Sequence, residues 1–169
     1  MNDFFNELTD RPGEVTDQKR LGCLCWQSGP ITASLRTDRT GYVSGEIIQF
    51  RAEVENLSNR DMDNIFLSLV EVVTYQGWHQ GSHGDKMEET VVEKVRREEN
   101  IRPRSVELWE GRISLPSLPP TGLAGNCGII DVQYWLDLCV DPTGPSFDLV
   151  VRLPIMLGTL PIQLQESQT

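Results

Sequence analysis

The sequence predicts an all-β fold, an antiparallel β-sandwich, because three observations point the same way. Apolar and polar residues alternate over residues 130–140 and again over 147–157, and a turn rich in proline and glycine at 141–145 joins the two runs. Alternation with a period of two is typical of half-buried strands, so this pair predicts an antiparallel hairpin. About seven strand-like runs in one chain favour two packed sheets.

The elements before this hairpin follow from similar patterns. Residues 31–35 and 48–54 alternate, and the second run places charged residues opposite its apolar face. Residues 65–75 are almost continuously apolar, which is typical of a strand buried on both faces. Residues 77–85 contain three glycines and predict a loop. Residues 106–113 complete the set as another strand.

The ends of the chain are expected to lie outside the sandwich. Residues 1–22 are polar and show no sustained period, which predicts a linker or a disordered lead. The sandwich is expected to span residues 23–162, and a short tail follows at 163–169.

Residues 87–99 fit two structures from local sequence alone. The segment is highly charged, and Val91 and Val95 lie four positions apart, as on one face of a helix. A charged edge strand is also compatible with this composition. Helix and strand both remain open at this point.

The charge and composition of the chain argue against several classes of protein. The net charge of this 169-residue chain is −10, which repels nucleic-acid backbones and anionic lipid surfaces. No run reaches the roughly 18 apolar residues of a membrane span, and the start lacks the pattern of a secretory signal. Four cysteines are few for a disulfide framework. We therefore expect a cytosolic protein.

The sequence carries no motif for catalysis or metal binding. Cys23 and Cys25 are separated by one residue, too few for a usual zinc pair. His79 and His83 lie among glycines, where four-residue spacing does not bring two rings together. Nucleophile elbows, metalloprotease helices and phosphate-binding loops are missing. We predict no catalytic residue, no cofactor and no metal site, and hence no enzyme.

Two residues stand out as candidates for function. Cys127 lies in a glycine-containing stretch before a predicted strand, where an exposed thiol could form a mixed disulfide and a buried one would be inert. Trp135 falls on the polar side of its strand, between Gln133 and Asp137. An aromatic residue there packs under another part of the protein or marks an interface with a partner.

Several phrases, in this order and spacing, resemble the C-terminal arrestin domain of the alpha-arrestins, the family related to thioredoxin-interacting protein. The resemblance runs from about residue 15 to 162, nearly the whole chain. The phrases are GCLC at 22–25, SGPI at 28–31, DRTGYVSGE at 38–46, AEVEN at 52–56, ISLPSLPPT at 113–121, IDVQY at 130–134 and LPIMLGT at 153–159.

The resemblance implies an immunoglobulin-like, mostly antiparallel sandwich without catalytic residues. It assigns residues 87–99 to a long strand, and residues 38–45 to a turn and short crossing. It also implies a protein-binding adaptor that works in endocytosis and membrane-protein trafficking, located in the cytoplasm beside the plasma membrane and endosomes. Its implied partners are receptor cargo, the N-terminal arrestin domain of the same protein and HECT-type ubiquitin ligases.

The chain departs from the family pattern in two ways. Ligases are recruited through Pro-Pro-x-Tyr motifs in a tail, but Pro119 and Pro120 continue into Thr121 rather than to a tyrosine. The chain also lacks a first sandwich, so we expect either an excised domain or a family member with altered function. Two alternatives remain: a redox-responsive protein that pairs with a thioredoxin-like partner through Cys127, and a retromer-type sorting subunit with an arrestin fold.

Overall fold

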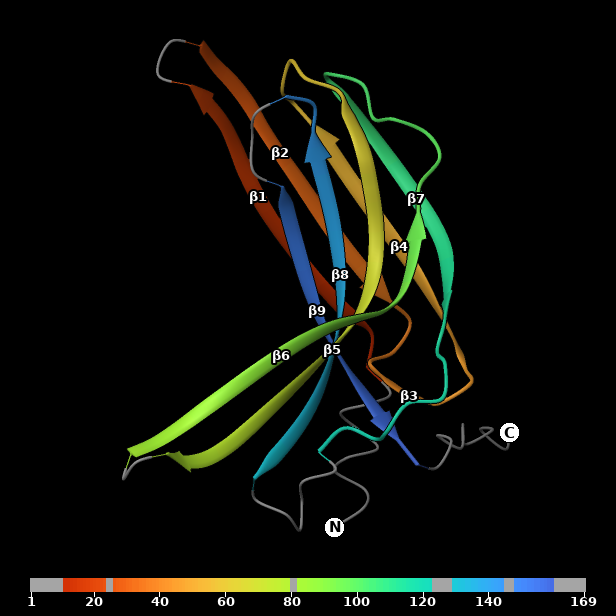
Figure 1. The fold of residues 1–169 in the computed structure, drawn as a ribbon. Coiled ribbons are helices and arrows are strands. Elements are labelled where there is room, and N and C mark those ends of the chain that lie inside the picture. The colour runs from red at the N-terminus through yellow and green to blue at the C-terminus, as the bar shows by residue number, and fades with distance from the viewer. Residues whose placement is uncertain (1–10, 24–25, 80–81, 123–128, 145–147, 160–169) are drawn as a thin grey trace, which may run out of the picture.

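The computed structural model describes residues 11–23, 26–79, 82–122, 129–144 and 148–159. These residues form two sheets that face each other (Figure 1). The strands are β1 (Gly13–Cys23), β2 (Trp26–Thr37), β3 (Gly41–Val43), β4 (Ile47–Asn56), β5 (Met62–His79), β6 (Ser82–Arg96), β7 (Ser105–Ser114), β8 (Ile130–Pro142) and β9 (Leu149–Gly158).

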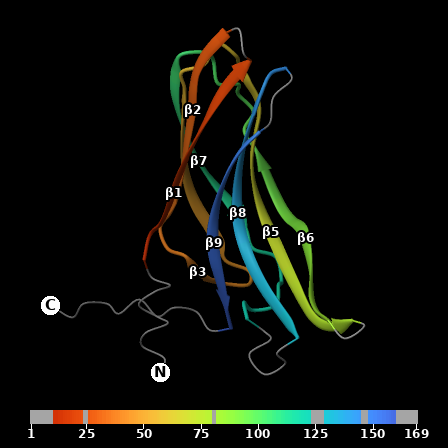
Figure 2. The same ribbon diagram turned by 90° about the vertical axis from the view of Figure 1, so that its left-hand side faces the viewer.

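The strand order confirms the predicted β-sandwich. One sheet has the order β1-β2-β4-β7, and the other has the order β3-β9-β8-β5-β6. Figure 2 shows the two sheets as separate layers. Every pairing is antiparallel except that of β3 with β9, which is parallel. The predicted hairpin is present as β8 and β9, in register from Tyr134 with Ile155 to Val140 with Leu149.

The core lies between the sheets and is supplied by alternate residues of nearly every strand. β4 alternates exposed and buried positions along its length, and β9 does the same with some half-buried positions. Burying one such aliphatic side chain contributes about 1.5–3 kcal/mol, so this alternation fixes which face of each strand points inward. The largest fully buried side chains are Tyr42, Tyr134, Ile31, Leu35, Ile48, Met62, Ile65, Leu67, Leu69, Ile101, Ile113 and Leu136.

The structure corrects the expectation that residues 1–22 form a linker. Residues 13–22 belong to β1, which pairs with β2 from Gly13 opposite Thr37 to Cys23 opposite Trp26. An edge strand is held by its backbone ladder and needs little apolar surface. Val15 packs against the core, while its neighbours on either side are polar. Residues 1–10, and the predicted tail at 163–169, lie outside the described residues.

Strands also replace the predicted loop at 77–85. β5 and β6 pair almost to their tips, with Gly77 opposite Gly84 and Trp78 opposite His83. Figure 1 shows this long hairpin reaching away from the four-stranded sheet. The backbone ladder continues through glycine because it does not depend on side chains.

β6 also settles the structure of the segment at 87–99. The strand reading implied by the family resemblance is confirmed as far as Arg96. Val91 pairs with Val70, whereas Val95 pairs with Leu67, and the register shifts between them. A β-bulge of this kind inserts one extra residue into a strand. The four-residue spacing of Val91 and Val95, which suggested one face of a helix, therefore spans a bulge in a strand.

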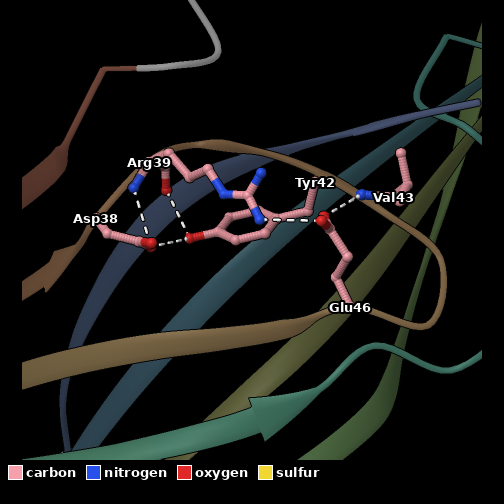
Figure 3. A network of polar contacts seen from close by, with 5 residues as sticks. All are labelled: Asp38, Arg39, Tyr42, Val43 and Glu46. Carbon is pink, nitrogen blue, oxygen red and sulfur yellow. Dashed lines mark hydrogen bonds and ion pairs between the residues drawn. The ribbon is translucent and has the colours of Figure 1, made fainter. Parts of the chain in front are cut away.

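A polar network fixes the crossing from β2 into β4 (Figure 3). The Tyr42 hydroxyl lies 2.7 Å from Asp38 Oδ1 and 2.8 Å from the Arg39 carbonyl oxygen. Arg39 lies over the Tyr42 ring, 4.6 Å from its centroid, and its Nη2 is 3.0 Å from Glu46 Oε1. Glu46 Oε2 accepts the Val43 N–H at 2.8 Å. These contacts seat β3 beside β9, as the predicted short crossing requires.

Replacing Tyr42 with phenylalanine tests this network. Loss of the hydroxyl hydrogen bond should lower the free energy of unfolding by about 1–1.5 kcal/mol at pH 7. Burial and then Asp38 raise the pKa of Tyr42. The folded state therefore holds this proton after the unfolded state has lost it, and stability falls as pH rises above about 10.

Urea unfolding between pH 8 and pH 11 measures how the free energy of unfolding depends on pH. Tyr134 has a raised pKa for a related reason, since it is buried and lies beside Glu71. Tyr42→Phe should therefore make the decline above pH 10 shallower without abolishing it. An unchanged slope would show that Tyr42 does not keep its proton in the folded protein.

Candidate binding surface

The outer face of the five-stranded sheet carries the candidate residue Trp135. Its neighbours Tyr134 and Leu136 point into the core, so alternation places Trp135 on the opposite face. Across the sheet, Trp135 pairs with Val70 of β5 and Pro154 of β9. The side chain is half-buried. This placement agrees with the sequence-based assignment of Trp135 to the outward side, while its role as an interface residue stays a prediction.

Three charged residues from three strands meet beside this tryptophan and are named here the Arg152 clasp: Arg152 of β9, Asp137 of β8 and Glu89 of β6. Arg152 donates to both carboxylate oxygens of Asp137 from one edge of its guanidinium, at 2.8 Å from Nε to Oδ1 and 2.7 Å from Nη2 to Oδ2. Its Nη1 and Nη2 also donate to Glu89, at 3.1 Å and 3.3 Å. The clasp crosses β8 and β5, which lie between β9 and β6.

In the clasp, the positive charge of Arg152 and the negative charges of its two carboxylate partners stabilise one another. Hydrogen bonds to Asp137 and Glu89 raise the pKa of Arg152, and the guanidinium lowers the pKa of Glu89. The guanidinium also lies 5.7 Å from the centroid of the Trp135 ring, within cation–π range. On the same outer face, Val70 pairs with Trp135 and Val72 pairs with Glu89, and both valines are almost completely buried.

An apolar hollow of about 330 Å³ opens beside the clasp. Six residues form what we name the outer hollow: Phe66, Ser68, Val70, Val91, Cys139 and Val150, and the carboxylates of Glu89 and Asp137 complete its lining. Val91 and Val150 are 58% and 45% exposed. Lys94 folds over the Phe66 ring, with its Nζ 3.4 Å from the ring centroid.

The floor of the outer hollow contains an unsatisfied hydroxyl. Ser68 is only 3% exposed, and its Oγ has no hydrogen-bond partner among the described residues. Leaving a buried hydroxyl unpaired costs about 1–3 kcal/mol. Sequence reasoning missed this residue, although a serine in the middle of the apolar run at 65–75 was a usable signal.

Cys139 lines the outer hollow, but its surroundings make its thiol unreactive. Its thiol is buried and lies 3.5 Å from Asp148 Oδ2. Burial, followed by the negative charge of Asp148, raises the pKa of Cys139 to about 12. The thiolate is the reactive form, so this environment suppresses reaction near neutral pH.

We expect native Cys139 to resist iodoacetamide at pH 8 and to react at least about a hundredfold faster in urea, because unfolding restores an ordinary thiol pKa and exposes the sulfur. Mass spectrometry of the peptide that contains Cys139 measures both rates. Equal rates in the two conditions would show that this thiol is accessible in the folded protein.

The other sequence candidates lie outside the described residues or at the tip of a hairpin. Cys127 and Cys25 lie outside the described residues, so the redox interpretation of Cys127 stays a prediction. His79 and His83 occupy the paired ends of β5 and β6 rather than a loop. Within the described ranges, no group of three or more metal-binding side chains is placed to hold an ion. No helix among the described residues has the length and apolarity needed to cross a membrane.

The architecture is shared with a solved structure of low sequence identity. The sporulation control protein Spo0M of Bacillus subtilis matches with a TM-score of 0.55 and 14% identity over 88% of this chain and 50% of that protein. At this level of identity the likeness concerns the fold alone. It defines the class of protein as a two-sheet sandwich.

Sequence comparison identifies the family. The model of the arrestin (or S-antigen) C-terminal domain matches residues 27–162, so the chain belongs to this family. Mouse arrestin domain-containing protein 4 is 32% identical over 86% of the chain and 33% of that relative. Human arrestin domain-containing protein 1 is 26% identical over 94% and 34%, and Caenorhabditis elegans arrestin domain-containing protein 17 is 32% identical over 81% and 30%. The chain thus spans about a third of the length of these relatives.

Proposed function

We propose that this chain is a non-catalytic, protein-binding module of an arrestin-type adaptor. The observation that carries the proposal is the family match over residues 27–162. A rigid sandwich that presents an apolar hollow and a half-buried tryptophan on one outer face suits the binding of another protein. In this proposal the sheet positions the contact residues, and no bond is made or broken.

The wider role belongs to the full-length protein. There the module would lie beside an N-terminal arrestin sandwich, hold receptor cargo at the plasma membrane and endosomes, and support endocytosis. A tail with Pro-Pro-x-Tyr motifs would recruit HECT-type ubiquitin ligases through their WW domains, which bind proline-rich segments. The proposed location is the cytoplasmic side of these membranes. These roles follow from the family resemblance.

A capture experiment tests the module by itself. The chain is immobilised and exposed to reduced cytosol and to detergent-solubilised membranes, and bound proteins are identified by mass spectrometry. An unrelated acidic β-sandwich of similar charge is the control bait. Enrichment of integral membrane proteins on this chain over the control supports the proposal. Equal recovery on both baits contradicts it, because the binding would then reflect charge alone.

A further inference from the structure

The outer hollow has the features of a recognition site rather than of a packing defect. Its apolar walls include two well-exposed valines, Val91 and Val150. Its floor holds the hydroxyl of Ser68, which no described group satisfies. A volume of about 330 Å³ is at the small end of the range for ligand sites, about 300–1,000 Å³. This volume suits one or two apolar side chains better than a large cofactor.

The charges around the outer hollow indicate whether its ligand is positively or negatively charged. Glu89 and Asp137 line one side, and Asp148 lies beside Cys139 at another. Asp141 lies close by, and burial, followed by the negative charge of Asp148, raises its pKa. Arg152 is bound by two carboxylates, and Lys94 lies over Phe66. A third cation, Lys19, donates to the Asp148 carbonyl oxygen at 3.0 Å. Four carboxylates against these three cations leave the surroundings acidic, in keeping with a net charge of −10 for the chain.

From these observations we infer that the outer hollow binds an extended peptide segment that carries an apolar side chain flanked by lysine or arginine. The apolar side chain enters between Val91 and Val150, and a polar group of the segment satisfies Ser68. The flanking cation interacts with Glu89, at the open end of the Arg152 clasp, where the Glu89 side chain is 46% exposed. Opposite charges across such a rim steer association and select the partner.

This inference rests on the proposed function and makes its ligand specific. Cytoplasmic segments next to membrane spans carry an excess of lysine and arginine. An apolar residue within such a segment has the chemistry that the outer hollow requires. The ligand class is thus the basic, membrane-adjacent part of a membrane protein.

Peptide selection tests the specificity. Random nine-residue peptides displayed on phage are selected on the immobilised chain, and the recovered peptides are synthesised for affinity measurement. We expect an apolar residue with lysine or arginine within two positions of it. Recovery of acidic or uncharged peptides, or of none, overturns the inference. So does tight binding to vesicles of anionic lipid with no peptide recovered, because the surface would then bind membranes directly.

Matched variants locate the site. Val91→Asp places a charge in the outer hollow, whereas Val106→Asp places the same charge at an equally exposed valine, 57% exposed, on the other sheet. Val91→Asp should weaken peptide binding at least tenfold, and Val106→Asp should change it less than twofold. Equal effects of the two substitutions overturn the inference. Glu89→Gln should weaken binding three- to tenfold and flatten its dependence on salt, because it removes the attraction to the cation.

Ser68→Ala separates recognition from folding. Removing an unpaired buried hydroxyl should leave the melting temperature unchanged or raise it, and yet weaken peptide binding. Unaltered binding would contradict the role of Ser68. The capture experiment distinguishes the two levels of the proposal. A chain that captures membrane proteins but selects no basic peptide retains its function and loses this inference, whereas a chain that captures none loses the function itself.

Discussion

Replacing Asn56 with aspartate should cost about 4 kcal/mol of the free energy of unfolding at pH 8, because it leaves a buried charge without compensation. Asn56 is completely buried at the end of β4. Its Nδ2 donates to the carbonyl oxygens of Arg60 at 2.8 Å and Arg102 at 3.0 Å. Its Oδ1 accepts the N–H and the hydroxyl of Ser58, at 3.0 Å and 2.6 Å. The side chain thus joins two separate segments.

A carboxylate of the same shape can accept from Ser58 but cannot donate to the two carbonyl oxygens. Burial would also raise the pKa of the new carboxyl group, so its penalty should shrink as pH falls toward 4 and the group takes up a proton. Urea unfolding at pH 5 and pH 8 measures this difference. Asn100→Asp, at an exposed position, is the control and should change stability by less than about 0.5 kcal/mol. A cost below about 1 kcal/mol at pH 8 for Asn56→Asp would contradict this account.

Replacing Gly29 with alanine should destabilise the protein by about 3 kcal/mol through a backbone collision. A Cβ at Gly29 would lie 2.2 Å from the Leu57 carbonyl oxygen and 2.8 Å from its carbon. Leu57 cannot easily retreat, because its N–H donates to the Pro30 carbonyl at 3.0 Å. The substitution would push β2 away from the segment that follows β4.

Gly77→Ala is the matched control for this effect, because a Cβ at Gly77 meets nothing within 4 Å. We expect a change of less than about 0.5 kcal/mol there. Thermal and urea unfolding of both variants measure the contrast. Similar stabilities for the two would show that the close approach of β2 to Leu57 is not a constraint on the fold.

Most of the sandwich could be predicted because β4, β8 and β9 alternate apolar and polar residues and β5 contains a long apolar run. The β8–β9 hairpin combines that period with a proline- and glycine-rich turn, and both signals are local. β1 was not predictable in the same way, because an edge strand depends on its backbone ladder with β2. From local sequence alone β6 stayed open, because its charges suit either structure. The family resemblance assigned it to a strand, and its pairing with β5 confirms that assignment.

The candidate site was predictable only in part. Trp135 could be placed on the outward face by alternation alone. The Arg152 clasp could not, since it requires the relative register of four strands and brings together residues that are far apart in the sequence. Nothing local distinguishes Glu89 from the neighbouring glutamates of β6. Recognition surfaces on sheet faces are properties of register, which local patterns do not encode.

We propose that this arrestin-family sandwich binds partner proteins through the outer face of its five-stranded sheet. The most direct test compares the membrane proteins captured by the wild-type, Val91→Asp and Val106→Asp chains, each first shown to be folded. We expect the Val91→Asp chain to lose the captured proteins and the Val106→Asp chain to retain them. Retention by Val91→Asp together with loss by Val106→Asp would place the binding surface on the opposite sheet and contradict the account.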